Sequence, residues 1–253
     1  MVLSVTVVVG ALLLFPGDLR HKAHVLLQGI CAQRPSHSFQ FSGQPLPVDA
    51  RMTGIYLGAA ASLLWFILIC RARYSGRLTR GTWVAIVVSI SMMALDGLNS
   101  LAADLVISTP YATTNFPRVA TGLLAGVAIG AFLSHLVTIS LTHRPGGGWA
   151  PSPGSTLAFP LLLGALLCAL AASGLPSLAL PLTFLVIASG QAVLWAMACV
   201  VVALALRRGW GFASAKQRDE TLALAFLVAC VLLLGLAGWR AALEQVVGQG
   251  GLS

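Results

Sequence analysis

The feature that most constrains the fold is a succession of long apolar segments separated by short polar ones. A helix needs roughly 20 mainly apolar residues to cross the hydrocarbon core of a bilayer. Segments of about this length recur along the chain and predict an all-α fold: a polytopic transmembrane helical bundle of about seven spans, with residues 1–253 as one domain. The predicted spans are residues 2–15, 52–70, 82–107, 119–142, 156–173, 179–206 and 220–239.

The composition excludes a water-soluble domain, because 58% of the residues are hydrophobic and only 9% are charged. The first span is the shortest and is close in length to the core of a signal peptide. It lacks a basic leader, and no small-residue cleavage site precedes Pro16. We interpret it as a short or tilted membrane helix. A cleaved signal, which would leave six spans, is the alternative.

The orientation is predicted from Lys and Arg, which favour short cytoplasmic loops. The loops after the second, fourth and sixth spans carry nine of the 15 basic residues, and they alternate so that all three can be cytoplasmic. This pattern predicts an amino terminus inside and a carboxyl terminus outside a plasma or inner cell membrane. The formal charge of +8 then needs no nucleic acid. The lipid bilayer is the expected partner, and a membrane-protein partner or a homo-oligomer stays open.

Residues 16–51 become an outer polar loop in this topology, with an interfacial helix expected over residues 18–30. Basic residues outnumber acidic ones in this loop, which runs against the usual tendency on the outer side. We therefore expect a requirement other than membrane topology to keep these basic residues on the outer side. Thr53, just after the loop, is predicted to cap the second span. The candidate site residues of the loop are Cys31, Gln33, Arg34, His37 and Asp49.

The third span contains acidic residues, which are unfavourable within a bilayer unless they are paired or hydrated. Asp96, Ser100 and Asp104 recur every four residues, so they share one helical face, and Asn99 neighbours it. An aspartate within a span costs about 2.5–3.5 kcal/mol unless it meets a partner or water. Asp96 is therefore a candidate site residue at the outer half of the bundle.

The second and fourth spans begin alike, each with an arginine followed by T-G-x-x-x-G. Glycines at this spacing favour close helix contact, and the likeness indicates an internal repeat. Both spans run inward in the predicted topology, so the positive ends of their dipoles face the outer side, where they favour an anion. The predicted substrate-binding residues are Arg51, Thr53, Asp96, Asn99, Asn115 and Arg118.

Four motifs in residues 31–126 carry a resemblance to a known family. They are C-x-Q-x-P-x-x-S-F, P-V-x-A-R-x-T-G-I-Y-x-G, D-G within a span, and N-x-x-R-x-x-T-G-x-x-x-G. Over roughly residues 25–135 the chain resembles the uncharacterised membrane proteins called domain of unknown function 2085. The resemblance implies an outward polar site, and in relatives with Cys-His-Gln a metal or thiol site. Here Ala32 stands in place of that histidine, and Asp49 and Met52 stand where relatives often carry cysteines.

The spacing requires no metal or other cofactor, and none is predicted. Cys31, His37 and Asp49 are the candidates for a zinc or copper site, if one exists. No disulfide partner is evident for Cys31, which we interpret as a packed thiol. The sequence contains neither a nucleophile elbow nor a dinucleotide-binding glycine motif. We therefore predict no catalytic residue and lean against an enzyme.

Three functional hypotheses remain. The first is a carrier or binding protein with an outward-facing polar site for a small anionic or zwitterionic solute. The second is a non-catalytic subunit of a larger membrane complex. The third is a metal- or thiol-dependent membrane enzyme built around Cys31 and His37. In each, residues 52–142 carry the motifs and residues 156–239 supply apolar support.

Overall fold

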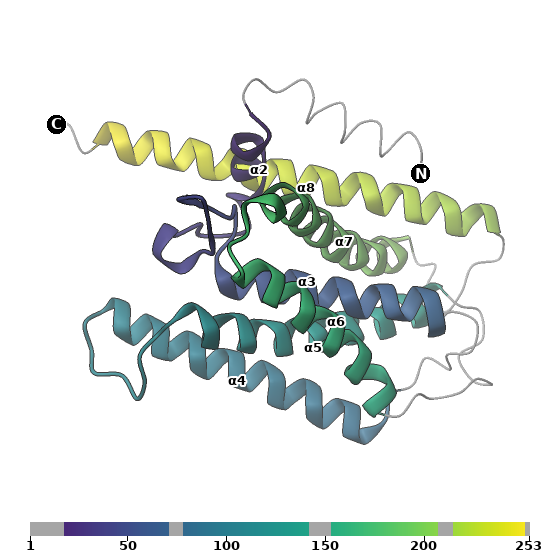
Figure 1. Cartoon of the computed structure of the whole chain (residues 1–253). Coiled ribbons are helices and arrows are strands. Elements are labelled where there is room, and N and C mark those ends of the chain that lie inside the picture. Colours follow the sequence, from purple (N-terminus) through teal and green to yellow (C-terminus); the bar gives the residue numbers. More distant parts are fainter. Residues whose placement is uncertain (1–17, 71–77, 142–152, 207–214, 251–253) are drawn as a thin grey trace.

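The computed structural model describes residues 18–70, 78–141, 153–206 and 215–250. These residues form seven α-helices that pack into one bundle (Figure 1). The helices are α2 (Leu19–Leu27), α3 (Ala50–Trp65), α4 (Arg80–Asp104), α5 (Asn115–Leu141), α6 (Pro153–Ala172), α7 (Ala179–Ala205) and α8 (Ala215–Gly250). A π-helical turn, Phe66–Cys70, continues α3.

Five stretches are long and apolar enough to cross a membrane: Ala50–Leu68, Arg80–Asp104, Asn115–Ser140, Pro176–Ala205 and Lys216–Val246. They correspond to the second, third, fourth, sixth and seventh predicted spans. The fifth predicted span coincides with a shorter apolar helix, Thr156–Ala172, inside α6. The first predicted span lies outside the described residues. The chain is thus a multi-pass helical protein with at least five helices suited to spanning.

The centre of the bundle is the contact between α3 and α5, which run parallel. Gly54 lies against the backbone of Val119, and Gly122 lies against the backbone of Arg51. Each glycine therefore contacts the residue three positions before the other glycine, which gives the pair a local twofold relation. A Cβ atom on either glycine would overlap the facing backbone, so the close approach requires residues without a side chain.

The other helices surround this pair. α6 and α7 pack against both α3 and α5, whereas α4 packs mainly against α5, and α8 packs against α7 and α2. Figure 1 shows α4 and α8 at opposite edges of the bundle. Both edge helices expose apolar side chains, among them Leu98 on α4 and Val231 on α8. Such faces suit contact with lipid.

One end of the bundle, which we call the polar end, consists of α2, residues 28–49 and the α4–α5 loop, residues 105–114. α2 begins after Asp18, whose carboxylate accepts the His21 N–H at 2.8 Å. Residues 28–49 contain a 3₁₀ turn, Pro35–His37, and a short antiparallel hairpin. The strands of this hairpin, β1 (Gln40–Phe41) and β2 (Gln44–Pro45), are an addition to the predicted all-α fold.

The prediction that Thr53 caps the second span is wrong. The helix begins at Ala50, and Asp49 is its cap, because the Asp49 carboxylate accepts the Met52 N–H at 2.8 Å. Thr53 is fully buried in the first turn, where its hydroxyl donates to the Asp49 carbonyl at 2.9 Å. Aspartate in the extended conformation directly before the helix satisfies a free N–H better than a residue already inside the first turn.

Candidate functional site

Two residues of the first motif, Cys31 and Gln33, hold the loop to the helices. The Cys31 thiol accepts the backbone N–H groups of Gln33 and Asp49 at 3.4 and 3.3 Å. Gln33 adopts a φ of 54° and its side-chain amide donates to the carbonyls of His24 and Pro47 at 2.8 and 2.9 Å. These contacts join the end of α2 to the start of α3, so the loop has a fixed position.

Cys31 is a buried thiol with no disulfide. Burial, together with the negative charge of Asp49, raises the pKa of Cys31 to about 11. A thiol with such a pKa stays protonated at neutral pH, and the thiolate is the form that attacks electrophiles and binds metals. Among the described residues, no group of three His, Cys, Asp or Glu side chains is arranged to hold a metal ion.

The polar end also contains a network of side chains that we call the polar cluster. It is formed by Arg34, His37, Arg51, Asp96, Asn99, Ser100, Asp104, Tyr111, Asn115, Arg118 and Thr121. Its members come from the starts of α3 and α5, the second half of α4, and the two loops of the polar end. The parallel packing of α3 and α5 brings Arg51 and Arg118 to the same level beside α4.

Asp96 occupies the deep part of the cluster and is 2% exposed. Its carboxylate lies 2.5 Å from the Arg51 guanidinium. The Tyr111 hydroxyl donates to the other carboxylate oxygen at 2.6 Å, and the Thr121 hydroxyl donates at 3.1 Å. The hydrogen bond to Asp96 also raises the pKa of Tyr111, which lies in the loop outside the spans. Asp96 is therefore an ionised, fully paired carboxylate, as an acid at this depth must be.

Arg118 is 5% exposed, but its partners are all neutral. It donates to Ser100 and Asn115, each at 3.4 Å, and to the His37 ring at 3.2 Å. Burial and the neighbouring Arg118 charge hold the pKa of His37 below its usual value, so Nε2 of the neutral ring accepts this bond. Among the described residues, no carboxylate lies within 4.0 Å of the Arg118 guanidinium.

The rim of the cluster connects the loop to α4 and α5. Arg34 forms an ion pair with Asp104, and the same carboxylate lies 3.9 Å from the His37 ring. The Asn115 amide donates to the Ser38 carbonyl at 3.4 Å. These contacts place His37 between a carboxylate on α4 and a guanidinium on α5.

Two buried polar atoms of the cluster have no partner within the described part of the protein. The Asn99 side chain donates to the Tyr111 carbonyl at 3.1 Å, but its oxygen accepts nothing. The Arg51 Nε–H group is likewise unsatisfied. Buried polar atoms are nearly always hydrogen-bonded, so this acceptor and this donor are groups that a bound molecule or water would satisfy.

Five of the six residues predicted to bind substrate therefore lie in one cluster: Arg51, Asp96, Asn99, Asn115 and Arg118. Arg34 and His37 of the loop join them. Thr53 lies outside the cluster, and Cys31, Gln33 and Asp49 hold the loop. The predicted sets omitted four members of the cluster: Ser100, Asp104, Tyr111 and Thr121. The shared face with Asp96 indicated Ser100, whereas nothing in the loop sequence singled out Tyr111.

Comparisons with known proteins agree with this location of the motifs. The sequence model of a family described as "Predicted membrane protein (DUF2085)" matches residues 31–132. A protein of Methanothermobacter thermautotrophicus named "Uncharacterized protein" is 32% identical over 111 residues, which are 43% of this chain and 90% of that protein. No solved structure matches the chain. The matched range includes every residue of the polar cluster, and the chain belongs to the DUF2085 family of predicted membrane proteins.

Proposed function

We propose that this multi-pass membrane protein binds a small anionic or zwitterionic solute at the polar cluster and acts as a carrier or binding protein for it. We place the polar end outside the cell, the amino terminus inside and the carboxyl terminus outside, in the plasma or inner membrane. The distribution of basic residues among the loops supports this orientation.

The observation that carries the proposal is the buried guanidinium of Arg118, which has only neutral partners. A charge removed from water without a counter-charge is strongly unfavourable. A bound anion would supply the missing charge, and a carboxylate matches the planar fork of a guanidinium. The amino end of α5 lies beside Arg118 and adds the positive end of its dipole.

Two further features support a ligand with both charges. The unsatisfied Asn99 oxygen is an acceptor for an ammonium group. The Tyr111 carbonyl, which accepts from the Asn99 amide, is a second acceptor beside it. A carboxylate at Arg118 and an ammonium near Asn99 would use both ends of the cluster. Ion-paired acids within spans are also typical of transporters.

The test is ligand binding by the full-length protein in nanodiscs of zwitterionic lipid. The midpoint of thermal unfolding is measured against acetate, glycine and phosphate, with choline as a cationic control. We expect at least one of the anionic or zwitterionic probes to raise the midpoint and choline to have no effect. Arg118→Gln is expected to weaken binding by about ten-fold or more, since it removes a charge-assisted hydrogen bond.

The matched control is Arg218→Gln on α8, which removes an arginine that is exposed and paired with Asp219. It should bind like the unsubstituted protein. Without ligand, Arg118→Gln should be at least as stable as the control, because the substitution removes a buried charge that pairs directly with no carboxylate of the described residues. Equal binding by both variants would contradict the proposal. A partner protein that copurifies with an unresponsive cluster would favour the complex-subunit hypothesis instead.

The buried, protonated thiol of Cys31 gives no support to a thiol-dependent enzyme.

A further inference from the structure

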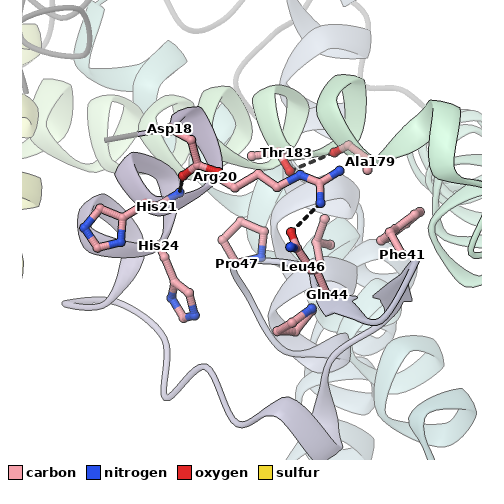
Figure 2. Close-up of a pocket in the computed structure, with 11 residues that line it drawn as sticks. Asp18, Arg20, His21, His24, Phe41, Gln44, Leu46, Pro47, Ala179 and Thr183 are labelled. Carbon is pink, nitrogen blue, oxygen red and sulfur yellow. Dashed lines mark hydrogen bonds between the residues drawn. The ribbon is translucent and has the colours of Figure 1, made fainter. Parts of the chain in front are cut away.

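A second polar region of the polar end encloses a pocket of about 200 Å³ between α2, the hairpin and the start of α7. Figure 2 shows Arg20 extended across it, with His21 and His24 toward the other end of α2. Phe41 and Leu46, each 2% exposed, provide an apolar wall. None of the residues that line this pocket belongs to the polar cluster. Its volume is below the 300–1,000 Å³ typical of sites for drug-sized ligands, so its ligand must be small.

The charge in this pocket is an arginine without an acidic partner. The Arg20 guanidinium donates to the Gln44 side chain of the hairpin at 2.5 Å. Within the described residues no carboxylate lies within 4.0 Å of it. Neither the His21 ring nor the His24 ring makes a hydrogen bond or ion pair with a described residue. Three nitrogen-rich side chains of one helix are therefore available to a ligand.

The pocket also lies at the amino end of α7. Ala179, the first residue of that 27-residue helix, lines the pocket, and the preceding Leu178 provides no side-chain cap. Pro176 begins the short 3₁₀ turn that leads into the helix. The amino end of a long helix carries a partial positive charge, which acts at the pocket even though the Ala179 N–H donates to the Pro176 carbonyl. This end is therefore a second, independent source of positive potential beside Arg20.

Asp18 is the acidic residue that lines the pocket, and its carboxylate is engaged in capping α2. Its carboxylate accepts the His21 backbone N–H and caps α2. This contact keeps the carboxylate at the start of α2, whereas the Arg20 guanidinium extends to the hairpin (Figure 2).

We propose that this pocket is a second binding site, for a small organic phosphate whose oxygens bond Arg20 in the positive field of the amino end of α7, and whose apolar part contacts the hairpin. Arginine and helix amino ends are recurrent phosphate ligands. The same chemistry is found in a soluble phosphate ester and in the headgroup of an anionic lipid.

The test uses phenyl phosphate as the soluble probe and benzyl alcohol as its uncharged counterpart, with the full-length protein in phosphatidylcholine nanodiscs. The lipid source is tested in mixed phosphatidylcholine and phosphatidylglycerol nanodiscs, by native mass spectrometry of retained lipid. We expect phenyl phosphate to bind, phosphatidylglycerol to be retained, or both, and benzyl alcohol to have no effect. Arg20→Gln should weaken the phosphate binding by about ten-fold or more.

A matched variant keeps this test decisive. Lys22→Gln removes the same charge from the same helix, but Lys22 does not line the pocket, so binding should be unchanged. Equal losses in Arg20→Gln and Lys22→Gln would overturn the assignment. So would the absence of binding by both phosphate probes.

Discussion

The arginines in the first turns of α3 and α5, Arg51 and Arg118, hold their charges differently. Arg51 pairs with the Asp96 carboxylate at 2.5 Å, and its side chain is 24% exposed. Arg118 is more deeply buried and bonds Ser100, Asn115 and His37. These two helix starts thus hold one cation paired with a carboxylate and one with neutral partners, and we expect the second to attract the solute.

His37 makes the stability of the polar end depend on pH. Its pKa is lowered by burial and by Arg118 of α5, against the raising effect of Asp104 on α4; within the loop, Arg34 lowers it and Asp49 raises it. The unfolded chain, with a histidine pKa of about 6.5, takes up the proton first as the pH falls. The contribution of His37 is therefore fully present above about pH 6.5 and is lost as the pH falls toward the lowered pKa.

We expect the unfolding midpoint to fall between about pH 7.5 and about pH 5, and to fall less in His37→Gln, whose side chain still accepts a hydrogen bond but does not titrate. His21→Gln on α2 controls for the loss of a histidine outside the cluster. The measurement is thermal unfolding in nanodiscs at several pH values. An identical pH profile for His37→Gln and the unsubstituted protein would refute the role of His37.

At the scale of elements, α3 and α5 are the most closely packed pair among the described helices. Gly126 lies against the carbonyl of Ile55, and the Ser62 hydroxyl donates to the Val127 carbonyl at 3.0 Å. Close backbone contact and interhelical hydrogen bonds are the means by which membrane helices associate without a hydrophobic driving force. This contact also sets the distance between Arg51 and Arg118, and hence the shape of the polar cluster.

Gly126→Ala is expected to destabilise the protein by about 1–3 kcal/mol, because the new methyl group would overlap the Ile55 backbone. The matched control is Gly235→Ala on α8, where an added Cβ meets no atom within 4 Å. There the change should be neutral or slightly stabilising, since alanine favours the helix. Reversible unfolding in detergent measures both variants. Comparable losses in the two would mean that α3 and α5 do not depend on this close approach.

At the scale of the whole molecule, the apolar pattern was sufficient to predict a mainly helical membrane protein and the location of five helices long and apolar enough to span a membrane. The spacing of Asp96 and Ser100 predicted a polar face, because that relation is local to one helix. Contacts between residues on different helices were harder to predict from the sequence. The pocket joins Arg20 to Ala179, far along the chain, and depends on how α7 packs against α2.

The contacts of the α4–α5 loop were equally difficult to predict from the sequence. The hydrogen bond from Tyr111 to Asp96 requires the loop to fold back over α4, the helix that precedes it. The error at Thr53 has a local cause, since Asp49 four residues earlier is the better helix cap. The number of spans and their orientation stay predictions.

The orientation can be tested with two single cysteines at opposite ends of the bundle. Ala112 lies exposed in the α4–α5 loop, at the polar end. Lys216 lies exposed at the start of α8, whose other half is anchored at the polar end by the bond from Arg240 to the Gln28 carbonyl at 2.7 Å. In intact cells a membrane-impermeant maleimide should label Ala112→Cys, and should label Lys216→Cys only after permeabilisation. The unsubstituted protein measures the background from native cysteines.

The reverse labelling pattern would place the polar end in the cytoplasm. The basic residues of α2 and residues 28–51 would then follow the positive-inside tendency, and the larger group of nine in the other loops would oppose it. The solute of the polar cluster would be a cytoplasmic one. The expected pattern instead requires Arg20, Lys22, Arg34 and Arg51 to remain outside against that tendency. The phosphate site proposed at Arg20 gives one of these charges a reason to be there, and the ion pairs of Arg34 with Asp104 and of Arg51 with Asp96 account for two more.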